Sequence, residues 1–343
     1  FRRVLFRSSY TKQLDIKRSF VKDALMRIGK IDVEVLNTIE SLEQLFYRKH
    51  IKLKIQNSQI GYVRHSLKGI ISIKKCLIFD SDTSTIINDL KLLINLFIGI
   101  DELHIFQENK NSYVIYANAY KKFNKELGNL IIKQITSIKG VIVKHNNNYK
   151  YYGDCELNNV VDNIKLVYSP LVFMQANKKQ SQNIIYKILE LAALNNCKNI
   201  IDLYCGIGVS SLFLRKAGYN VVAIELNPHA ILYAQKNALI NNITGISWHA
   251  MDAENFTSLD LSNFDTDTII INPPRIGMSK TLISKLLSLK VKNIFYISCM
   301  PSTLARDLKL LGTNYTINYV QPYDMFPQTT HVETLVYLRL NYD

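Results

Sequence analysis

The sequence predicts an α/β protein with a doubly wound, mostly parallel sheet of the Rossmann-like type in its C-terminal half, residues 171–343. Short apolar runs alternate with helical stretches through this half, which is typical of repeated β-α units. A glycine turn, Gly206-Ile207-Gly208, stands between the first of these strands and the following helix. The chain before residue 171 is richer in Lys and Arg and lacks the alternation, so we expect a basic α+β region there.

Charge separates the two halves of the chain. Residues 1–150 hold 26 Lys and Arg against 13 Asp and Glu, whereas residues 151–343 hold 16 against 15. A basic front half and a nearly neutral back half fit a protein that binds RNA or DNA with one part and carries out chemistry with the other. The alternative is a general drift toward Lys-rich composition without any binding role.

Composition excludes several other classes of protein. Hydrophobic residues make up 48% of the chain, as in ordinary globular proteins. No apolar run reaches the roughly 20 residues of a membrane helix, so we expect a cytoplasmic protein that binds no membrane. The five cysteines are odd in number and scattered, which argues against a disulfide framework and fits a reducing compartment.

We expect four segments along the chain. Residues 1–8 begin without Met and are interpreted as a non-native leader. Residues 9–84 are expected to be the remnant of an RNA-binding domain, and residues 85–170 a small α+β middle domain. Residues 171–343 form the predicted sheet domain.

The N-terminal elements are predicted from periodicity. Apolar residues recur at helical spacing from Tyr10 to Ile28 with Lys and Arg between them, which predicts an amphipathic basic helix. Alternating patterns predict antiparallel strands at residues 47–55, 61–64 and 69–73. Their Lys and Arg side chains, with Tyr47 and Tyr62, could contact RNA phosphates and bases. An edge sheet kept soluble by charge explains the same residues equally well.

The later elements follow in order. The middle domain is predicted to contain a helix at Ile86–Ile98, strands at His104–Gln107, Ser112–Ala117 and Gly140–Lys144, and a polar turn at residues 146–148. A long helix at about residues 179–194 precedes the alternating part. Strands are predicted there at residues 198–204, 220–224, 246–249, 267–271, 293–298, 315–320 and 333–340. Helices are predicted at residues 209–217, 228–241, 279–288 and 302–311.

The glycine turn has the features of a nucleoside-binding site. Gly206 and Gly208 allow a tight turn and close approach of a ligand to the backbone. Glu225 ends the second strand, where a carboxylate can accept both ribose hydroxyls, and Asp252 after the third strand could meet an adenine amine. Ser211 stands where a dinucleotide fingerprint needs its last glycine, so S-adenosylmethionine is favoured over a nicotinamide cofactor. A generic β-α turn with a capping acid is the structural alternative.

The fourth strand ends in Asn272-Pro273-Pro274-Arg275, a position where a methyltransferase can present an amide and backbone carbonyls to a substrate base. Enzymes that methylate exocyclic amines usually place an aromatic residue after the prolines to stack the base. Arg275 stands there instead. This difference argues against methylation of an amine.

A thiol and a carboxylate complete a hypothesis of methylation at a pyrimidine carbon. Carbon 5 of uracil becomes nucleophilic only after a thiolate adds at carbon 6, and a base must later remove the carbon 5 proton. Cys299 ends a predicted strand and precedes a helix whose N-terminal dipole would favour a thiolate. Glu333 opens the last strand and is the candidate base, while Asp324 is expected to tie down its own loop. Cys205 competes for the thiol role but is expected to face the cofactor.

These motifs resemble the RNA uracil-5 methyltransferase family, which uses S-adenosylmethionine. The resemblance runs from about Tyr10 to the end, and its most specific parts are Ser298 to Asp307 and Asp324 to Glu333. It implies that Cys299 is the nucleophile and Glu333 the base. It also implies that Gln175, Tyr204, Glu225, Asp252 and Asn272 line the cofactor pocket. The chain departs from the family pattern at three positions, where it has Val209, Asn272 and Met300.

Within the family, the chain is most similar to the branch that modifies 23S ribosomal RNA. That branch carries a [4Fe-4S] cluster, and Gln13-Leu14-Asp15-Ile16-Lys17 matches the helix after its first three cysteines. Cys76 matches the fourth ligand, so residues 9–84 would be the remnant of an iron-sulfur domain. One cysteine cannot hold the cluster, which is therefore expected only in a full-length parent. The chain is expected to act as a monomer. A transfer-RNA enzyme and a non-catalytic RNA-binding protein remain as alternatives.

Overall fold

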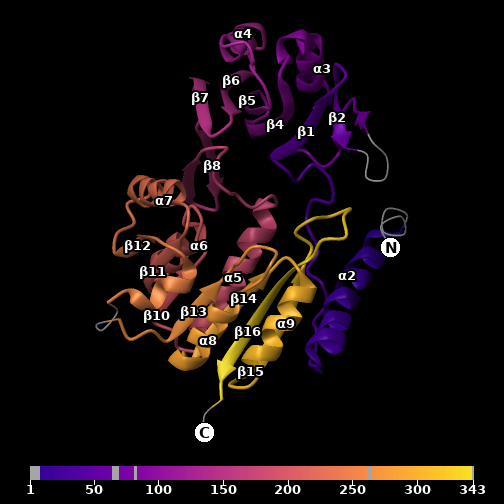
Figure 1. Ribbon diagram of the computed structural model, residues 1–343. Coiled ribbons are helices and arrows are strands. Elements are labelled where there is room, and N and C mark those ends of the chain that lie inside the picture. The colour runs from indigo at the N-terminus through magenta and orange to yellow at the C-terminus, as the bar shows by residue number, and fades with distance from the viewer. Residues whose placement is uncertain (1–7, 64–68, 81–82, 261–263, 342–343) are drawn as a thin grey trace. The chain divides into compact units, whose positions relative to one another are not determined.

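The computed structural model describes residues 8–63, 69–80, 83–260 and 264–341, which fall into two compact units (Figure 1). Unit 1 comprises the described residues of 1–42, 160–165 and 172–343, and unit 2 comprises those of 43–159 and 166–171. Residues 1–7 of the expected leader lie outside the described residues. The division differs from the expected boundary at residue 84, because the N-terminal helix packs with the C-terminal sheet and not with the strands that follow it.

Unit 1 is built on a seven-stranded sheet in the order β12-β11-β10-β13-β14-β16-β15. The strands are β10 (Asn199–Leu203), β11 (Asn220–Glu225), β12 (Ile246–Ala250), β13 (Thr268–Ile271), β14 (Asn293–Ser298), β15 (Tyr315–Tyr323) and β16 (Glu333–Leu340). β10 to β14 pair in parallel, and β16 lies antiparallel between β14 and β15. The predicted Rossmann-like, mostly parallel sheet is confirmed.

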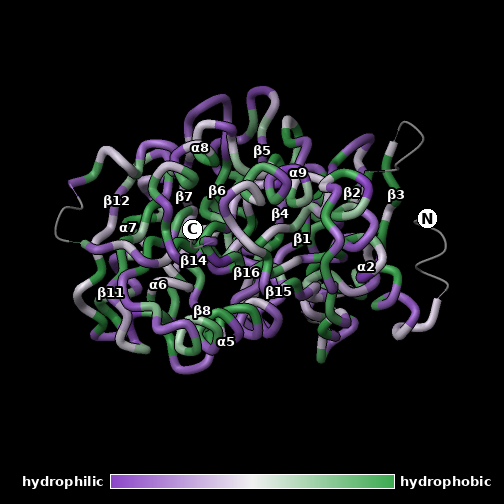
Figure 2. Tube along the Cα trace, turned by 90° about the horizontal axis from the view of Figure 1, so that it is seen from below, coloured by the Kyte–Doolittle hydropathy of each residue, from purple (hydrophilic) through white to green (hydrophobic). Residues whose placement is uncertain are grey.

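Helices cover both faces of this sheet. One face packs on α5 (Lys178–Leu194), α6 (Val209–Lys216) and α7 (Pro228–Ile240). The other packs on α8 (Lys280–Leu289), α9 (Pro301–Leu311), the short helix η3 (Ala253–Ser258), α2 (Tyr10–Ala24) and its π-helical extension η1 (Leu25–Gly29). Successive strand residues face opposite layers, so Ile200 packs with α5 and Ile201 with α8 and α9. Figure 2 shows hydrophobic stretches on these strands and hydrophilic stretches on many outer loops.

Local sequence sets where several of these helices begin. The side chain of Asn177 accepts a hydrogen bond from the backbone N–H of Gln180 at 3.2 Å and caps α5. Asn227 caps α7 in the same way, with Pro228 in the first turn. Such caps satisfy N–H groups that have no partner inside the helix. They explain why the predicted helix starts agree with the structure within two residues.

The amphipathic helix predicted at Tyr10–Ile28 is confirmed as α2 and η1, but a cation lies on its buried face. Lys17 is fully buried and forms an ion pair with Asp324. Its ammonium group also donates a hydrogen bond to the backbone oxygen of Phe326 at 3.0 Å. Tyr10 donates a hydrogen bond to the second carboxylate oxygen of Asp324 at 2.8 Å. Asp324 therefore fastens its loop to α2, and the expectation that it ties down only its own loop was incomplete.

Unit 2 contains a second seven-stranded sheet, in the order β3-β2-β1-β4-β5-β6-β7. Its strands are β1 (His50–Gln56), β2 (Gln59–Val63), β3 (Ile70–Ser72), β4 (Ile100–Asn109), β5 (Ser112–Ala119), β6 (Ile138–His145) and β7 (Asn148–Gly153). Among the described strands of this sheet, β5 and β6 pair in parallel and the other neighbours pair antiparallel. One face packs on α3 (Ser84–Leu92), η2 (Ile94–Phe97) and α4 (Leu127–Gln134).

Three features of unit 2 differ from the prediction. The polar turn at residues 146–148 is confirmed as a turn, but it joins β6 to a further strand, β7. The helix α4 was not predicted, and neither was the hairpin of β8 (Leu157–Val161) with β9 (Ile164–Tyr168), whose residues 160–165 belong to unit 1. Tyr47 is only 5% exposed, and Tyr62 lies on the core side, where its hydroxyl contacts the sulfur of Cys76 at 3.0 Å. Neither tyrosine lies on an exposed face, because strand alternation turns Tyr62 to the same side as Ile60.

A search of the described helices finds none long and apolar enough to cross a membrane.

The buried ion pair of Lys17 gives a test of this packing. We expect Lys17→Met to lower the free energy of unfolding by about 3–5 kcal/mol, because it leaves the carboxylate of Asp324 buried without its cation. The double variant Lys17→Met with Asp324→Asn should recover most of this loss. Lys12→Met, at an exposed position of the same helix, is the matched control. Urea unfolding measures all three, and equal stability of Lys17→Met and the wild type would contradict the assignment.

Candidate active site

Strand pairing brings Cys299 and Glu333 together. β14 and β16 are antiparallel, with Ser298 opposite Thr334 as their last pair. The next position in this register sets Cys299, directly after β14, opposite Glu333, the first residue of β16. Opposite residues of an antiparallel pair have Cβ atoms about 4.5–5.5 Å apart. The predicted thiol and carboxylate are thus neighbours, although the sequence places them in separate motifs.

Glu333 is buried in a way that opposes its ionisation. Its side chain is 3% exposed, and burial raises its pKa to about 8, with the guanidinium of Arg275 opposing the rise. At neutral pH the larger share of the carboxyl groups therefore carries a proton. A group with a pKa near the working pH can act as a general base without being locked in one protonation state.

Cys299 is half-buried, and its thiol is not activated in the free protein. Burial raises its pKa and the neighbouring carboxyl of Glu333 raises it further, while Arg275 lowers it through its charge and a hydrogen bond to the sulfur. We had expected the dipole of the following helix to favour a thiolate. Burial and Glu333 raise the pKa of Cys299 more than Arg275 and the backbone hydrogen bond lower it, and Arg275 is the cation that favours the thiolate.

The loop that carries Arg275 is fastened to α9. Thr303 donates a hydrogen bond to the backbone oxygen of Arg275 at 3.1 Å. Two residues of the same loop, Ile276 and Met278, accept hydrogen bonds from Arg306 through their backbone oxygens. The N–H of Met278 donates to the buried carboxylate of Asp307 at 2.8 Å. The helix that begins just after Cys299 therefore also positions Arg275.

A pocket beside the glycine turn contains most of the residues expected at the cofactor. Its lining includes Gln175, Tyr204, Gly206 and Asn272. Glu225 lies next to the pocket, and its carboxylate accepts hydrogen bonds from the N–H groups of Gly206 at 3.1 Å and Asn227 at 2.9 Å. Gly208 and Asp252 are not in the lining. Asp252 caps η3, accepting a hydrogen bond from the N–H of Glu254 at 2.9 Å.

The glycine turn leaves room for a ligand. Gly206 has a φ of +56°, and a Cβ atom built there would meet nothing within 4 Å. A Cβ atom at Gly208 would instead come within 2.6 Å of the Trp248 ring, so this glycine serves helix packing. The open space at Gly206 fits close approach of a nucleoside cofactor to the backbone.

Asp202, at the base of the turn, is a site residue that the sequence analysis did not assign. It lines the pocket and is buried, and its carboxylate accepts hydrogen bonds from the hydroxyls of Ser210 and Ser211, each at 2.6 Å. Burial raises its pKa to about 6, against these hydrogen bonds. Ser211, which distinguishes this turn from a dinucleotide fingerprint, thus orients Asp202. The spacing of Asp202 and Ser211, nine residues apart across the glycine turn, was the signal in the sequence that could have indicated this contact.

The remaining cysteines do not compete with Cys299. Cys205 lines the pocket beside the glycine turn and is 7% exposed, and burial raises its pKa well above the ordinary range. Cys76 is buried in the core of unit 2. Across the described ranges of the chain, no group of three or more His, Cys, Asp or Glu side chains could hold a metal ion. The described side chains therefore do not supply the four cysteine ligands of a [4Fe-4S] cluster.

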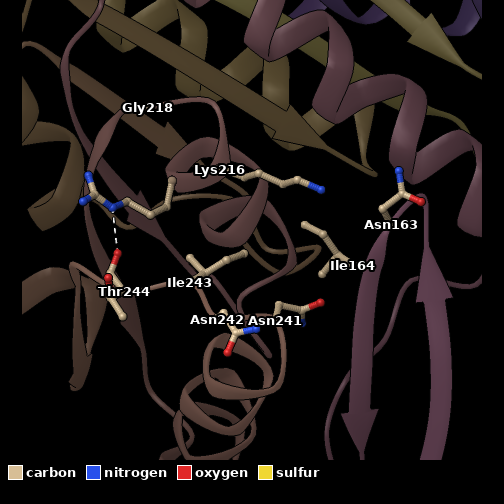
Figure 3. A pocket seen from close by; sticks show the side chains of 9 residues that line it. Asn163, Ile164, Lys216, Gly218, Asn241, Asn242, Ile243 and Thr244 are labelled. Atoms are coloured by element: carbon tan, nitrogen blue, oxygen red, sulfur yellow. Dashed lines mark hydrogen bonds between the residues drawn. The ribbon is translucent and has the colours of Figure 1, made fainter.

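A second hollow of unit 1 lies away from these residues (Figure 3). It is lined by residues from the β8–β9 hairpin, from α6 and from the segment after α7: Asn163, Ile164, Arg215, Lys216, Gly218, Asn241, Asn242, Ile243 and Thr244. Arg215 donates a hydrogen bond to the backbone oxygen of Thr244 at 2.7 Å. None of the residues expected at the active site lines this hollow, so we do not assign it a role in the methylation reaction.

The fold is that of S-adenosylmethionine-dependent methyltransferases. The family model for tRNA (uracil-5-)-methyltransferases matches residues 9–341. The chain belongs to this family, and it is an RNA (uracil-5-)-methyltransferase.

Similar proteins support the same placement. An RNA methyltransferase of Protochlamydia amoebophila, named as uncharacterized, is 34% identical over 340 residues, which cover 95% of this chain and 78% of that protein. A protein of Clostridium acetobutylicum with the same description is 32% identical, covering 96% of this chain and 79% of the relative. The crystal structure of Pyrococcus abyssi tRNA (uracil-54, C5)-methyltransferase with S-adenosyl-L-homocysteine is similar with a TM-score of 0.78 and 26% identity, covering 96% of this chain and 83% of that one.

Burial of Glu333 predicts a pH-dependent effect on stability. Because its pKa is near 8 when folded, against an ordinary 4.5, stability is lost as pH rises between these values. We expect Glu333→Gln to raise the free energy of unfolding by about 1–3 kcal/mol at pH ~9 and by little at pH ~4. Exposed Glu34 supplies the control variant Glu34→Gln. Urea titrations at both pH values measure this, and a gain that is independent of pH would rule out a raised pKa.

Proposed function

We propose that the protein methylates carbon 5 of a uridine in 23S ribosomal RNA, with Cys299 as nucleophile and Glu333 as base. The observation that carries this proposal is that the β14–β16 register, whose last pair is Ser298 with Thr334, brings Cys299 and Glu333 to adjacent strand ends, where each side chain is also affected by the charge of Arg275. A protein that only binds RNA has no need for a buried carboxyl group opposite a thiol. The alternative of a non-catalytic RNA-binding protein is therefore disfavoured.

The residues at the glycine turn are those proposed to hold the cofactor. Gln175, Tyr204, Gly206 and Asn272 line the pocket and Glu225 adjoins it, and the open space at Gly206 fits a nucleoside. Asp252 follows the third strand and would meet the adenine. S-Adenosylmethionine supplies an electrophilic methyl group when bound. Asn272, at the end of β13, is proposed to position the substrate base through its amide.

Three side chains of this protein are proposed to add to the base, remove its proton and stabilise the thiolate. Ionised Cys299 adds through its sulfur to carbon 6 of uracil, which shifts electron density to carbon 5 and makes that carbon nucleophilic. Once carbon 5 carries the methyl group, the carboxylate of Glu333 removes its proton. The electrons of this C–H bond re-form the carbon 5 to carbon 6 double bond, and Cys299 leaves as a thiolate. The guanidinium of Arg275 stabilises the thiolate at both ends of the cycle.

The choice of RNA rests on less direct observations. The Gln13 to Lys17 segment and Cys76 match the pattern of the ribosomal branch, which favours 23S ribosomal RNA. The similar Pyrococcus abyssi enzyme is named for uracil 54 of transfer RNA, and this supports transfer RNA as the second candidate. Methylation of 23S and transfer-RNA transcripts in parallel, with nuclease digestion and mass spectrometry, distinguishes the two. We further propose that a monomer is active, because all of the site residues come from one chain, and that it acts in the cytoplasm, where ribosomal RNA is found.

Covalent trapping tests the nucleophile. RNA that contains 5-fluorouridine cannot lose fluorine as a cation, so the wild type should form an adduct that survives denaturing electrophoresis. Cys299→Ala should form no adduct and lose methyl transfer, whereas Cys155→Ala, which removes a partly exposed thiol of unit 2, should retain adduct formation. Glu333→Gln should accumulate the adduct even with unmodified RNA, because the proton on carbon 5 stays in place. Adduct formation by Cys299→Ala would refute the nucleophile assignment.

The pH profile of methylation tests the roles of Glu333 and Arg275. The proposed reaction needs Glu333 as a carboxylate and Cys299 as a thiolate, so kcat/KM should rise about a hundredfold per pH unit up to a pH of about 8 and about tenfold per unit above it, until the thiol is ionised. Burial raises this pKa and Arg275 opposes the rise, so Arg275→Gln should shift the rising limb to higher pH. Arg275→Lys keeps the charge and should shift the limb less. A profile for Arg275→Gln that superimposes on the wild type would remove Arg275 from this role.

A further inference from the structure

An open hollow lies at the β7 edge of unit 2, between the loop before α4 and the β6–β7 hairpin. It has a volume of about 480 Å³, within the range of ligand sites. Lys122, Phe123 and Lys125 line it from the loop. The hairpin contributes Val143, His145, Asn148, Tyr149 and Lys150. We call this place the basic aromatic hollow.

Aromatic side chains form part of its wall and surroundings. Phe123 and His145 meet edge to face, with ring centroids 6.0 Å apart. Tyr149 is 42% exposed, and its ring centroid lies 6.5 Å from that of Tyr151, which is also exposed. Tyr149 lines the hollow and Tyr151 lies beside it, and exposed rings of this kind leave flat apolar faces in contact with water. Such faces are suited to stacking with another flat ring.

Lysines in and around the hollow lack acidic partners. No Asp or Glu is among the lining residues, which include three lysines. Lys144 lies over the ring of Tyr149 at 5.9 Å and adds a further positive charge beside the hollow. The lysines of β1 differ, because Lys52 and Lys54 form ion pairs with Glu102 at 2.7 and 3.0 Å. The positive charges of the hollow are therefore not neutralised by carboxylates, whereas those of β1 are.

We propose that the basic aromatic hollow binds an unpaired nucleotide of the RNA substrate, a proposal that rests on the RNA substrate proposed above. A base stacks on Tyr149 and the neighbouring rings, while Lys122, Lys125 and Lys150 contact the phosphates. Stacking on aromatic rings combined with a positively charged surface is the general means by which proteins bind single-stranded RNA. Sequence tolerance is expected, because every base offers a flat face for stacking.

Substitution of Tyr149 tests the stacking. Tyr149→Ala should weaken binding of a fluorescein-labelled oligouridylate about tenfold in fluorescence anisotropy titrations. Tyr149→Phe keeps the ring and should bind as the wild type does. Equal affinity of Tyr149→Ala and the wild type, with both folded by circular dichroism, would overturn the stacking role.

Charge removal tests the phosphate contacts. The triple variant Lys122→Ala, Lys125→Ala and Lys150→Ala should reduce the slope of log affinity against log salt by about two, at about 0.7 per phosphate contact in a single strand. Lys74→Ala, Lys75→Ala and Lys110→Ala remove the same charge from exposed positions outside the hollow, and this control should keep most of the slope. An equal loss of slope in the two triple variants would refute a local site and indicate net charge alone.

The adduct assay separates this inference from the proposed function. Variants of the hollow should still form the 5-fluorouridine adduct at saturating RNA, because Cys299 and Glu333 are unchanged. An adduct with unaltered oligouridylate affinity in the variants would refute the hollow and leave the proposed function intact. Absence of an adduct in the wild type would refute the proposed function, and the affinity and salt measurements would still decide whether the hollow binds RNA.

Discussion

The antiparallel pairing of β14 with β16 is the constraint on which the active site depends. If β16 ran parallel to β14, its first residue would lie at the opposite end of the strands from Cys299. Glu333 could then not meet the thiol. Because β16 runs back between β14 and β15, the end of one strand and the beginning of another lie side by side. A slip of one residue would turn Glu333 to the other face of the sheet. The β15–β16 pairing, from Tyr323 opposite Glu333 onward, helps to fix this register.

The thiol and the carboxyl group lie together in a buried place, and burial raises the pKa of both. A charged group loses its hydration there, so the neutral form is favoured. The charge of Arg275 lowers the pKa of both groups and so favours both anions. This accounts for an arginine after the two prolines in a protein for which covalent addition to the base is proposed. Asp307 then has an indirect effect on the chemistry. Its carboxylate accepts from Met278 and Tyr296 and holds the Arg275 loop in place.

The sequence was sufficient where the pattern is local. Strand and helix periodicity predicted the C-terminal sheet, and the glycine turn predicted the pocket that Gln175 and Asn272 were also expected to line. It was insufficient where a contact joins distant segments. The burial of Lys17 depends on Asp324, which lies 307 positions later, and nothing in a basic amphipathic helix indicates such a partner. Tyr62 was placed on an exposed face because one short strand gives no sign of which side is covered.

The positions of the lysines show why net charge alone does not locate a binding surface. Lys17 is buried in an ion pair, and Lys52 and Lys54 form ion pairs with two acids of β4, Asp101 and Glu102, so these positive charges have little attraction left for a polyanion. The lysines of the basic aromatic hollow stand beside rings instead of carboxylates. Counter-ions that gather there are released when phosphates replace them, which makes such a site favourable for RNA. The absence of acidic partners among the lining residues, more than the number of lysines, therefore marks this part of unit 2 for nucleic acid.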